Sequence, residues 1–262
     1  MENGTVFKVI LEMTGPYWRD KNILVIGASS DLCTDMLPFF VDEMGKVGLH
    51  CNSNPEPLRQ YEDRDNVKLY RQDFFEDKDC EKIVDDFADW SGRIDFLVIM
   101  TGNCLHPVNW TELSEDDLLK DYYINTVVPF EISRHTSQKM CEAGSGRIIF
   151  TGTASAQNAG GSNSLSYGAA KLALECIMKR MAKDCAAYNV LVNMVCPGFI
   201  NSKFHTQIMK RSEDEIRKRA GFVPLKRAGT YKEVASAYFY LLSEGASFIT
   251  GEVLNVKGGD WI

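Results

Sequence analysis

Seven short apolar runs alternate with longer amphipathic stretches, and this alternation constrains the fold more than any other feature of the sequence. The runs are continuously apolar, which is typical of strands covered by helices on both faces. They are Asn22–Gly27, Val47–Cys51, Val67–Tyr70, Ile94–Met100, Arg147–Gly152, Val190–Val195 and Val253–Val256. The pattern predicts an α/β fold with a doubly wound sheet of about seven parallel strands and helices on both faces.

The helices expected between and after these strands are Leu32–Met44, Lys78–Trp90, Glu115–Cys141, Ser166–Tyr188 and Tyr231–Ser243. Pro38 lies inside the first of them and is expected to kink or shorten it. No linker divides the chain, so we expect one domain over residues 21–262. Residues 1–20 form an N-terminal extension in which Val6–Leu11 is a candidate extra strand.

Charge and composition argue against several classes of function. A net charge of −7 leaves no basic stripe that could bind the phosphates of a nucleic acid. No run approaches the ~20 apolar residues of a membrane span, and residues 1–20 lack the pattern of a secretory signal. The eight cysteines show neither paired spacing nor a histidine spacing typical of zinc. We therefore expect no metal site, and reduced thiols in a cytoplasmic protein.

Tyr167 and Lys171 are the strongest candidates for chemistry. Their separation of four residues at the head of an expected helix places both side chains on one helix face. A nearby cation favours the phenolate and lowers a pKa that is ordinarily about 10, which makes the tyrosine a general acid or base. The spacing alone is not specific, and an exposed structural pair is the alternative.

The surroundings of this pair resemble a known family. The stretch GRIIFTGTASAQNAGGSNSLSYGAAKLALE, residues 146–175, resembles the active-site segment of the short-chain dehydrogenase/reductases at nearly every position. The run NMVCPGFI, residues 193–200, resembles the loop that lies over the nicotinamide in this family. The tail over residues 224–262 is similar to that of the 3-oxoacyl-carrier-protein reductase branch. The resemblance covers roughly residues 21–262. It implies a Rossmann-type fold, hydride transfer between a nicotinamide cofactor and a small carbonyl or secondary alcohol, and a homotetramer.

The resemblance also implies catalytic roles. Tyr167 would give or take the proton, and Lys171 would lower its pKa and bind the nicotinamide ribose. Thr153 would fix the substrate oxygen, with Ser155 in reserve and a strand-end cap as the structural alternative for Thr153. Its spacing to Tyr167 is one residue longer than in the family, which indicates a small insertion. Asn125, within YYINTVVPF, would support a water relay to the lysine.

Cofactor contacts are expected after the carboxyl ends of the strands. The residues that the resemblance assigns to them are Gly27, Ser29, Ser30, Asp31, Leu32, Asn52, Ser53, Asp73, Phe74, Thr101, Gly102, Tyr167, Lys171, Pro197, Gly198 and Ile200. Cys51 stands where an acidic residue would reject a 2′-phosphate, so NADP is favoured and NAD remains an alternative.

The dinucleotide fingerprint departs from the family pattern. Of its three glycines only Gly27 is retained, in the sequence GASSDLC. The missing glycines would let the backbone approach the pyrophosphate and the helix pack closely. Asp31 would repel phosphate unless it caps the helix, and we expect it to be that N-cap. After the fourth strand, Asn-Asn-Ala-Gly is replaced by Ile99-Met-Thr-Gly102.

The segment over residues 199–222 is expected to cover the substrate. His205 could contact the substrate, although a surface histidine on a mobile helix is the favoured interpretation. Carrier-protein reductases dock their acidic partner with two arginines. This chain has Gly144 and Tyr188 at the aligned positions. With the negative net charge, this favours a free small carbonyl or alcohol substrate.

Two alternatives to simple reduction remain open. A cofactor-impaired family member could act as a binding or assembly subunit, which the missing glycines favour and the retained Tyr167, Lys171 and Asn125 oppose. The fold and cofactor could also serve a redox-assisted elimination or epimerisation.

Overall fold

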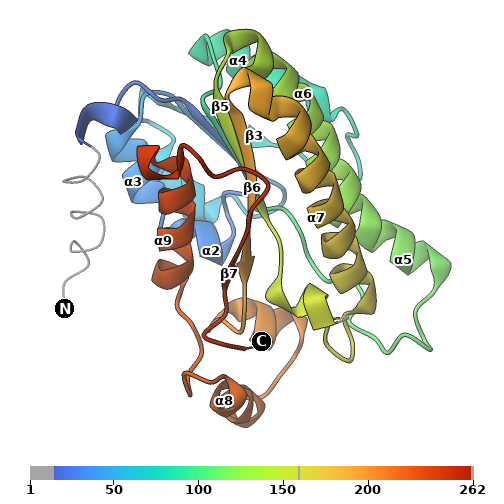
Figure 1. Ribbon diagram of the computed structural model, residues 1–262. Helices are drawn as coiled ribbons and strands as arrows, with labels where there is room; N and C mark the ends of the chain where they lie inside the picture. Colours follow the sequence, from blue (N-terminus) through green and yellow to red (C-terminus); the bar gives the residue numbers. More distant parts are fainter. Residues whose placement is uncertain (1–14, 159, 261–262) are drawn as a thin grey trace.

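Seven parallel strands form the centre of the molecule (Figure 1), as the apolar runs predict. The computed structural model describes residues 15–158 and 160–260, so the candidate strand Val6–Leu11 lies outside the described residues. The strands are β1 (Ile23–Ile26), β2 (Val47–Cys51), β3 (Val67–Arg71), β4 (Phe96–Ile99), β5 (Gly146–Thr151), β6 (Val190–Pro197) and β7 (Val253–Val256). Their order in the sheet is β3-β2-β1-β4-β5-β6-β7.

The strand order reverses direction between β1 and β4. The chain runs outward from β1 through β2 to β3, then returns to β4 beside β1 and continues to β7 on the other side. Every neighbouring pair is parallel, so all the carboxyl ends lie at one edge. A reversal of this kind opens a crevice at that edge, where ligands of such folds bind.

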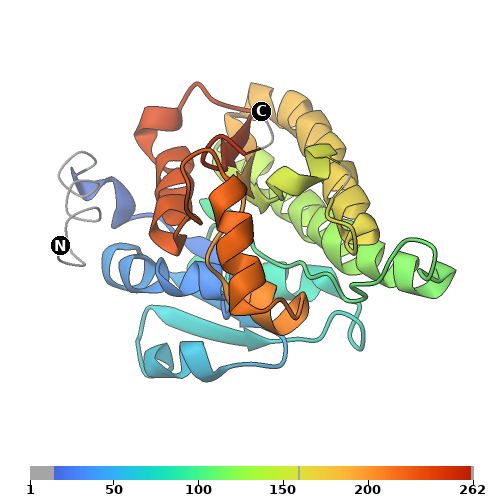
Figure 2. The ribbon, with the colours of Figure 1, turned by 90° about the horizontal axis from the view of Figure 1, so that it is seen from below.

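Helices cover both faces of the sheet. The α-helices are α2 (Asp31–Thr34), α3 (Leu37–Glu43), α4 (Cys80–Ser91), α5 (Glu115–Tyr122), α6 (Val128–Ala143), α7 (Leu165–Cys185), α8 (Glu213–Phe222) and α9 (Tyr231–Leu242). Short turns are η1 (Gly15–Trp18), η2 (Glu56–Tyr61), η3 (Tyr123–Val127), η4 (Ala154–Asn158), η5 (Ala186–Tyr188), η6 (Phe204–Ile208) and η7 (Glu244–Ala246). Helices α4, α6 and α7 lie on one side of the sheet, with α3 and α9 on the other (Figure 1). Seen from below, α8 lies in front of the sheet (Figure 2).

Two expected helices are interrupted. The prediction of one helix over Leu32–Met44 is wrong, because α2 and α3 are separate and Pro38 lies in the first turn of α3. Proline is tolerated there, since the first turn has no helical partner for its missing N–H, and the expected shortening is confirmed. The helix expected over Glu115–Cys141 runs through α5, η3 and α6 without a gap, and the π turn η3 around Asn125 interrupts its α-helical hydrogen bonding. Such π turns frequently occur at functional sites.

Two apolar clusters hold the layers together. Phe87, Ile132 and Leu174 belong to the cluster under α4, α6 and α7, and Phe40 and Phe239 to the one under α3 and α9. The second cluster also contains residue 18, a tryptophan with no exposed surface, whose ring meets those of residues 39 and 239 edge to face. The core therefore draws on the chain before residue 21.

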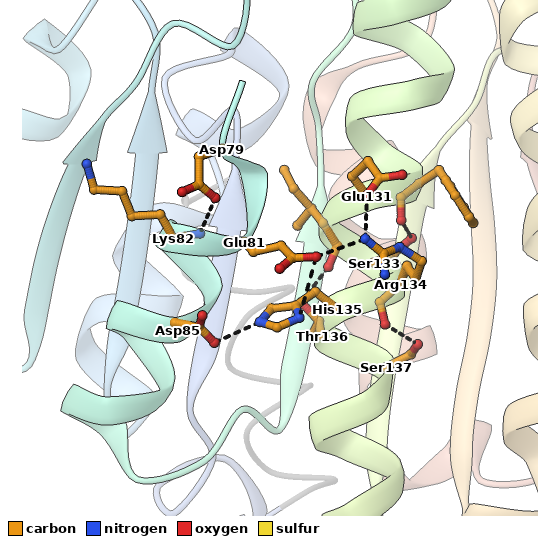
Figure 3. Close-up of polar contacts among 12 residues, drawn as sticks. Asp79, Glu81, Lys82, Asp85, Glu131, Ser133, Arg134, His135, Thr136 and Ser137 are labelled. Atoms are coloured by element: carbon orange, nitrogen blue, oxygen red, sulfur yellow. Dashed lines mark hydrogen bonds and ion pairs between the residues drawn. The ribbon is translucent and has the colours of Figure 1, made fainter. Parts of the chain in front are cut away.

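Charged side chains join α4 to α6 on the outer surface (Figure 3). Arg134 donates from Nη2 to Glu81 Oε1 at 2.8 Å and to Glu131 Oε2 at 2.6 Å. Asp85 lies one turn after Glu81 on α4, and its Oδ1 atom is 2.7 Å from Nε2 of His135 on α6. These bonds fix the spacing of the two helices at the surface.

Three further features concern binding and redox state. Over the described ranges, no helix is both long and apolar enough to cross a membrane. No group of three or more His, Cys, Asp or Glu side chains in that part of the chain is arranged to hold a metal ion. The eight cysteines are free thiols, of which six are buried.

Candidate active site

Tyr167 and Lys171 lie on the first two turns of α7, at the carboxyl edge of the sheet. Lys171 is buried, with 3% of its surface exposed. Its Nζ atom lies 5.9 Å from the centre of the Tyr167 ring. The same atom donates to Thr101 O at 3.0 Å and to Thr151 O at 2.9 Å. The lysine is thus tied to the ends of β4 and β5 beside the phenol.

Burial decides the protonation of this pair. Loss of solvent lowers the pKa of Lys171 to about 8, and Cys196 acts weakly in the opposite direction. Burial raises the pKa of Tyr167 above its ordinary value, with Cys104 and Cys196 adding to the rise. Desolvation of the phenolate therefore outweighs the favourable effect of the neighbouring cation, so that the net pKa of the phenol is raised and not lowered. The phenol keeps its proton at neutral pH.

Asn125 faces the same point from the π turn η3. Its Oδ1 accepts from Asn103 N at 3.1 Å, while its Nδ2 donates to Asn103 O and to Asp121 O, both at 2.8 Å. Gly102, with φ of +141°, lies between Asn125 and Lys171. A Cβ there would stand 2.6 Å from Asn125 Oδ1 and 2.5 Å from Lys171 Nζ. Only glycine fits where the backbone passes between these two side chains.

The hydroxyl candidates after β5 lie together. Thr153 Oγ1 and Ser155 Oγ are 3.0 Å apart. Thr153 also interacts with the Tyr167 phenol through a side-chain hydrogen bond that lowers the pKa of the phenol. The Phe204 ring lies 5.9 Å from the Tyr167 ring. The structure thus brings Tyr167, Lys171, Asn125 and Thr153 together, with residues of the covering segment beside them.

The turn after β1 retains the geometry that its single glycine allows. Gly27 has φ of +81°, and a Cβ there would stand 2.9 Å from Thr101 N. Its N–H donates to His50 Nδ1 at 3.2 Å. Ser30, not Asp31, is the N-cap of α2, because its Oγ accepts from Cys33 N at 3.3 Å. The expectation of an aspartate cap is wrong.

Asp31 instead makes contacts far along the chain. It is the first residue of α2, and its Oδ1 accepts from Lys203 Nζ at 2.9 Å. Its Oδ2 accepts from Tyr231 OH at 3.3 Å. Asp31, which replaces a glycine of the fingerprint, is therefore paired with the positive charge of Lys203, a residue of the segment over residues 199–222.

The remaining candidates after β1, β2 and β3 differ in exposure. Asn52 and Ser53 are exposed after β2, whereas Leu32 packs against the core. The Asp73 carboxylate accepts from Phe75 N at 2.9 Å. The other two are Ser29, which is partly buried, and Phe74, which is buried with its ring 4.7 Å from the His50 ring.

After β6, the Pro-Gly turn is packed against the C-terminal strand. Pro197 ends β6, and Gly198 N donates to Val256 O at 2.9 Å. A Cβ on Gly198 would stand 2.7 Å from Lys257 Cα. Ile200 is buried and forms an isolated bridge with residue 229. Packing against β7 thus requires glycine at this turn.

His205 is not the surface residue that we expected. It lies in η6 with its ring 4.3 Å from the Phe199 ring. Burial, followed by Arg211 and Arg219, lowers its pKa to about 4. It is therefore a neutral packing residue within the covering segment.

Sequence reasoning missed four residues that shape the site: His50, Asn103, Asp121 and Lys203. A histidine inside the apolar run VGLHC was the signal for His50. Asp121 stands four residues before Asn125 and so shares its helix face, which was a weaker signal. Nothing in the sequence pointed to Asn103 or Lys203, because their partners lie far along the chain.

Several features at this edge fit a nicotinamide dinucleotide. The buried Thr101 Oγ1 and Asn103 Oδ1 atoms have no hydrogen-bond partner among the described residues. They flank Gly102, and Gly27 leaves the backbone bare beside them. Unsatisfied polar atoms and bare backbone are what a polar cofactor needs. The Asp31 carboxylate would oppose a phosphate, and Lys203 balances its charge.

Comparison with known proteins agrees with this geometry. A family model described as enoyl-(acyl carrier protein) reductase matches residues 46–260. An uncharacterized oxidoreductase of Thermotoga maritima is 29% identical over 247 residues, which cover 92% of this chain and 98% of the relative. A 3-oxoacyl-(acyl-carrier-protein) reductase of Salmonella typhimurium is 33% identical over 193 residues, covering 68% of this chain and 71% of the relative.

Solved structures match over nearly the whole chain. A short-chain type dehydrogenase/reductase from Mycobacterium ulcerans has a TM-score of 0.82 at 24% identity, covering 92% of this chain and 90% of that one. A 7α-hydroxysteroid dehydrogenase complexed with NADH has a TM-score of 0.81 at 22% identity, covering 92% and 94%. At these identities the two structures speak for the fold alone. Because the family model spans most of the sequence, the chain belongs to the short-chain dehydrogenase/reductase family, a family of NAD(P)H-dependent oxidoreductases.

Proposed function

We propose that this oxidoreductase transfers a hydride between NADP(H) and a small carbonyl or secondary alcohol. The observation that carries the proposal is the meeting of Tyr167, Lys171, Asn125 and Gly102 at the carboxyl ends of β4 and β5. A buried, protonated phenol beside a buried lysine is suited to giving a proton to a carbonyl oxygen that is being reduced.

Each residue has one task in the reducing direction. Thr153 donates a hydrogen bond to the substrate oxygen, and Tyr167 then gives that oxygen its phenolic proton. Lys171 stabilises the phenolate that remains. Asn125 supports a water relay that returns a proton towards Lys171. A bound nicotinamide cofactor supplies the hydride, so that proton and hydride together convert the carbonyl to the alcohol.

The cofactor would be held by the turn after β1 and by the ends of β2 to β6. Gly27, Ser29, Ser30, Thr101 and Gly102 offer backbone and hydroxyl groups at the centre of this edge. The flanking contacts would come from Asp31, Leu32, Asn52, Ser53, Asp73, Phe74, Pro197, Gly198 and Ile200. NADP is the favoured form because β2 ends in a cysteine followed by Asn52 and Ser53, none of which repels a 2′-phosphate.

A free small molecule in the cytoplasm is the substrate that the charge pattern favours. The net charge of −7 opposes long-range attraction to an acidic carrier protein. Around the phenol, the covering segment presents Phe204, with Phe199 and His205 packed behind it. Apolar rings of this kind suit the carbon skeleton of a small ketone or alcohol.

Calorimetric titration with NADPH, and separately with NADH, tests the cofactor. We expect binding of NADPH, followed by turnover of a carbonyl compound found by screening. Tyr167→Phe should keep the cofactor affinity and lower kcat/KM by roughly 10²–10⁴-fold. Tyr188→Phe, at an exposed tyrosine beyond the far end of α7, is the matched control. Full turnover in Tyr167→Phe would refute the proposed chemistry.

A binding or assembly subunit is the second candidate function. The Asp31 carboxylate favours it, because it stands where the fingerprint has glycine. Failure of both NADPH and NADH to bind at millimolar concentration would select this candidate. Product analysis of any turnover would separate simple reduction from elimination or epimerisation.

A further inference from the structure

Asp121, near the end of α5, is a buried carboxylate for which the chemistry above has no use. It has no exposed surface. Its Oδ1 accepts from Leu105 N at 2.9 Å, and its Oδ2 accepts a short hydrogen bond from Ser166 Oγ. Its backbone carbonyl accepts from Asn125 Nδ2 at 2.8 Å. One residue therefore contacts the loop after β4, the first turn of α7 and the π turn that carries Asn125.

The first turn of α7 depends on this contact. Ser164 holds the N-cap position of α7, yet its side chain makes no capping bond and accepts instead from Gly161 N at 2.8 Å. Ser166 directly precedes Tyr167, and it too is buried. A bond from Ser166 to Asp121 thus holds the turn from which the phenol projects.

A buried carboxylate at this place calls for a reason. Burying an ionised group is costly unless its oxygens accept hydrogen bonds, and an apolar side chain could fill the same space without that cost. Both Asp121 oxygens do accept, from donors on two different segments. The satisfied geometry shows a position organised around the carboxylate.

We infer that Asp121 is a positioning residue for Tyr167: it ties the first turn of α7 to the loop after β4 and to Asn125, and so sets where the phenol stands. The inference rests on the proposed function for its consequence in catalysis. Its structural part, the placement of the phenol, does not depend on any substrate.

Charge gives Asp121 a second effect on the phenol. The titratable neighbours of Tyr167 are Lys171 on α7, Cys104 after β4, Cys196 on β6, Tyr238 on α9 and Asp121 on α5. Burial raises the pKa of Tyr167 most, followed by Cys104 and Cys196, and the Asp121 carboxylate adds to this rise. Asp121 therefore helps the phenol to keep the proton that it gives to a carbonyl oxygen.

Fluorine NMR tests the placement without cofactor or substrate. A 3-fluorotyrosine encoded at position 167 of the full chain is more acidic than tyrosine and reports its surroundings through one resonance. The variants are Asp121→Asn, which removes the charge, and Ser166→Ala, which removes the bond and keeps the charge. Asp116→Asn, an exposed carboxylate on the same helix, is the matched control.

We expect Asp121→Asn to move the titration midpoint of this resonance to lower pH, because a carboxylate that raises the pKa of the phenol is removed. Ser166→Ala should change the chemical shift of the resonance without that fall in the midpoint. Asp116→Asn should change neither the titration midpoint nor the chemical shift of the resonance. In the unlabelled enzyme, Asp121→Asn and Ser166→Ala should lower kcat roughly tenfold while the cofactor Kd stays within twofold, because misplacement of a catalytic group affects chemistry more than binding.

The outcomes separate the two proposals. A resonance that behaves in Asp121→Asn and Ser166→Ala as it does in Asp116→Asn overturns the positioning role. A resonance that moves as expected in a protein that turns over no carbonyl compound keeps the positioning role and removes the proposed function. If Asp121→Asn does not fold, Ser166→Ala decides alone, and an unchanged resonance there overturns the inference.

Discussion

Burial shifts the two central side chains, Lys171 and Tyr167, towards their neutral forms. It lowers the pKa of Lys171 to about 8 and raises that of Tyr167. The lysine is thus charged below pH 8 and loses its proton just above it, while the phenol stays protonated throughout that range. A proton donor beside a cation that loses its charge near pH 8 suits the proposed carbonyl reduction at neutral pH.

The pH profile of reduction should follow Lys171. As pH rises through about 8, kcat/KM should fall, because the lysine loses the charge that stabilises the phenolate left after proton donation. Lys171→Arg keeps its charge and should move this fall to higher pH, at a lower rate because the guanidinium fits the site poorly. Initial rates from pH 6 to 10 provide the measurement, and identical profiles in both proteins would contradict the role.

Lys203 should help cofactor binding by neutralising Asp31. Its side chain is 65% exposed, so the pair itself adds less than about 1 kcal/mol to stability and its effect belongs to binding. Lys203→Ala should weaken NADPH binding several-fold, and Asp31→Asn should tighten it, because the phosphates then meet less negative charge. The double variant should resemble Asp31→Asn.

Titration calorimetry at low and high salt measures both effects, which salt should reduce. Lys210→Ala removes an exposed lysine from the same covering segment and is the control. Equal affinities in Lys203→Ala and Lys210→Ala would show that Lys203 has no such role.

Among the elements, the ends of three strands depend on one histidine. His50 closes β2, accepts from Gly27 N after β1 at Nδ1, and lies 2.9 Å from Gln72 O through Nε2. These partners assign the proton to Nε2, since a carbonyl can only accept. A protonated ring would lose the Gly27 bond. His50 in its neutral form therefore holds the turn after β1.

Acid should destabilise the protein through His50. Burial lowers its pKa to about 4, below the ordinary value of 6.5. Its contribution to stability is therefore fully present above about pH 6.5 and is lost as pH falls towards 4, at up to about 1.4 kcal/mol per pH unit. Urea unfolding from pH 4 to 8 gives the free energy of unfolding at each pH. This free energy should depend less steeply on pH in His50→Asn than in the parent protein. Parallel curves for parent and variant would contradict this.

The bonds between α4 and α6 make a smaller contribution. Arg134, which is 40% exposed, joins Glu81 and Glu131 in a network (Figure 3). Arg134→Ala should lower the free energy of unfolding by less than about 1 kcal/mol, and 1 M salt should narrow the difference. Arg180→Ala, which breaks one exposed pair within α7, should cost less still. Thermal unfolding compares them, and a larger loss in Arg180→Ala would refute the network.

In the whole molecule, large apolar side chains remain exposed on the helices that carry the site. Leu119 on α5, Val127 in η3, and Leu165 and Leu172 on α7 are each at least 39% exposed. Exposed apolar residues on neighbouring helices are typical of subunit interfaces. They support the proposed homotetramer.

Light scattering should give about four times the mass of one chain. Leu172→Glu places a charge among these residues and should lower the mass, because a buried unpaired charge disfavours association. Phe222→Glu, at an exposed phenylalanine at the end of α8, should leave the mass unchanged. A monomer in the parent protein would remove the tetramer proposal.

The order of elements could be predicted because it depends on local pattern. Apolar runs of strand length and the helical periods between them occur in the sequence itself, so all seven strands were placed. The Tyr167–Lys171 pair followed from spacing on one helix. The break at Pro38 could be foreseen from the proline, whereas the π turn at Asn125 was not foreseen; Asn125 bonds there to Asn103, which lies on another segment of the chain.

The sequence by itself determined the fold class, the family and the placement of Tyr167 and Lys171 on one helix, because these depend on periodicity, spacing and motif. Only the tertiary structure decided the protonation of Tyr167, the counter-charge on Asp31, and the places of His50 and Asp121. Each of these depends on burial or on a partner from another segment of the chain. Solvent exclusion and long-range pairing arise only when the strands assemble, and together they set the charges of the site.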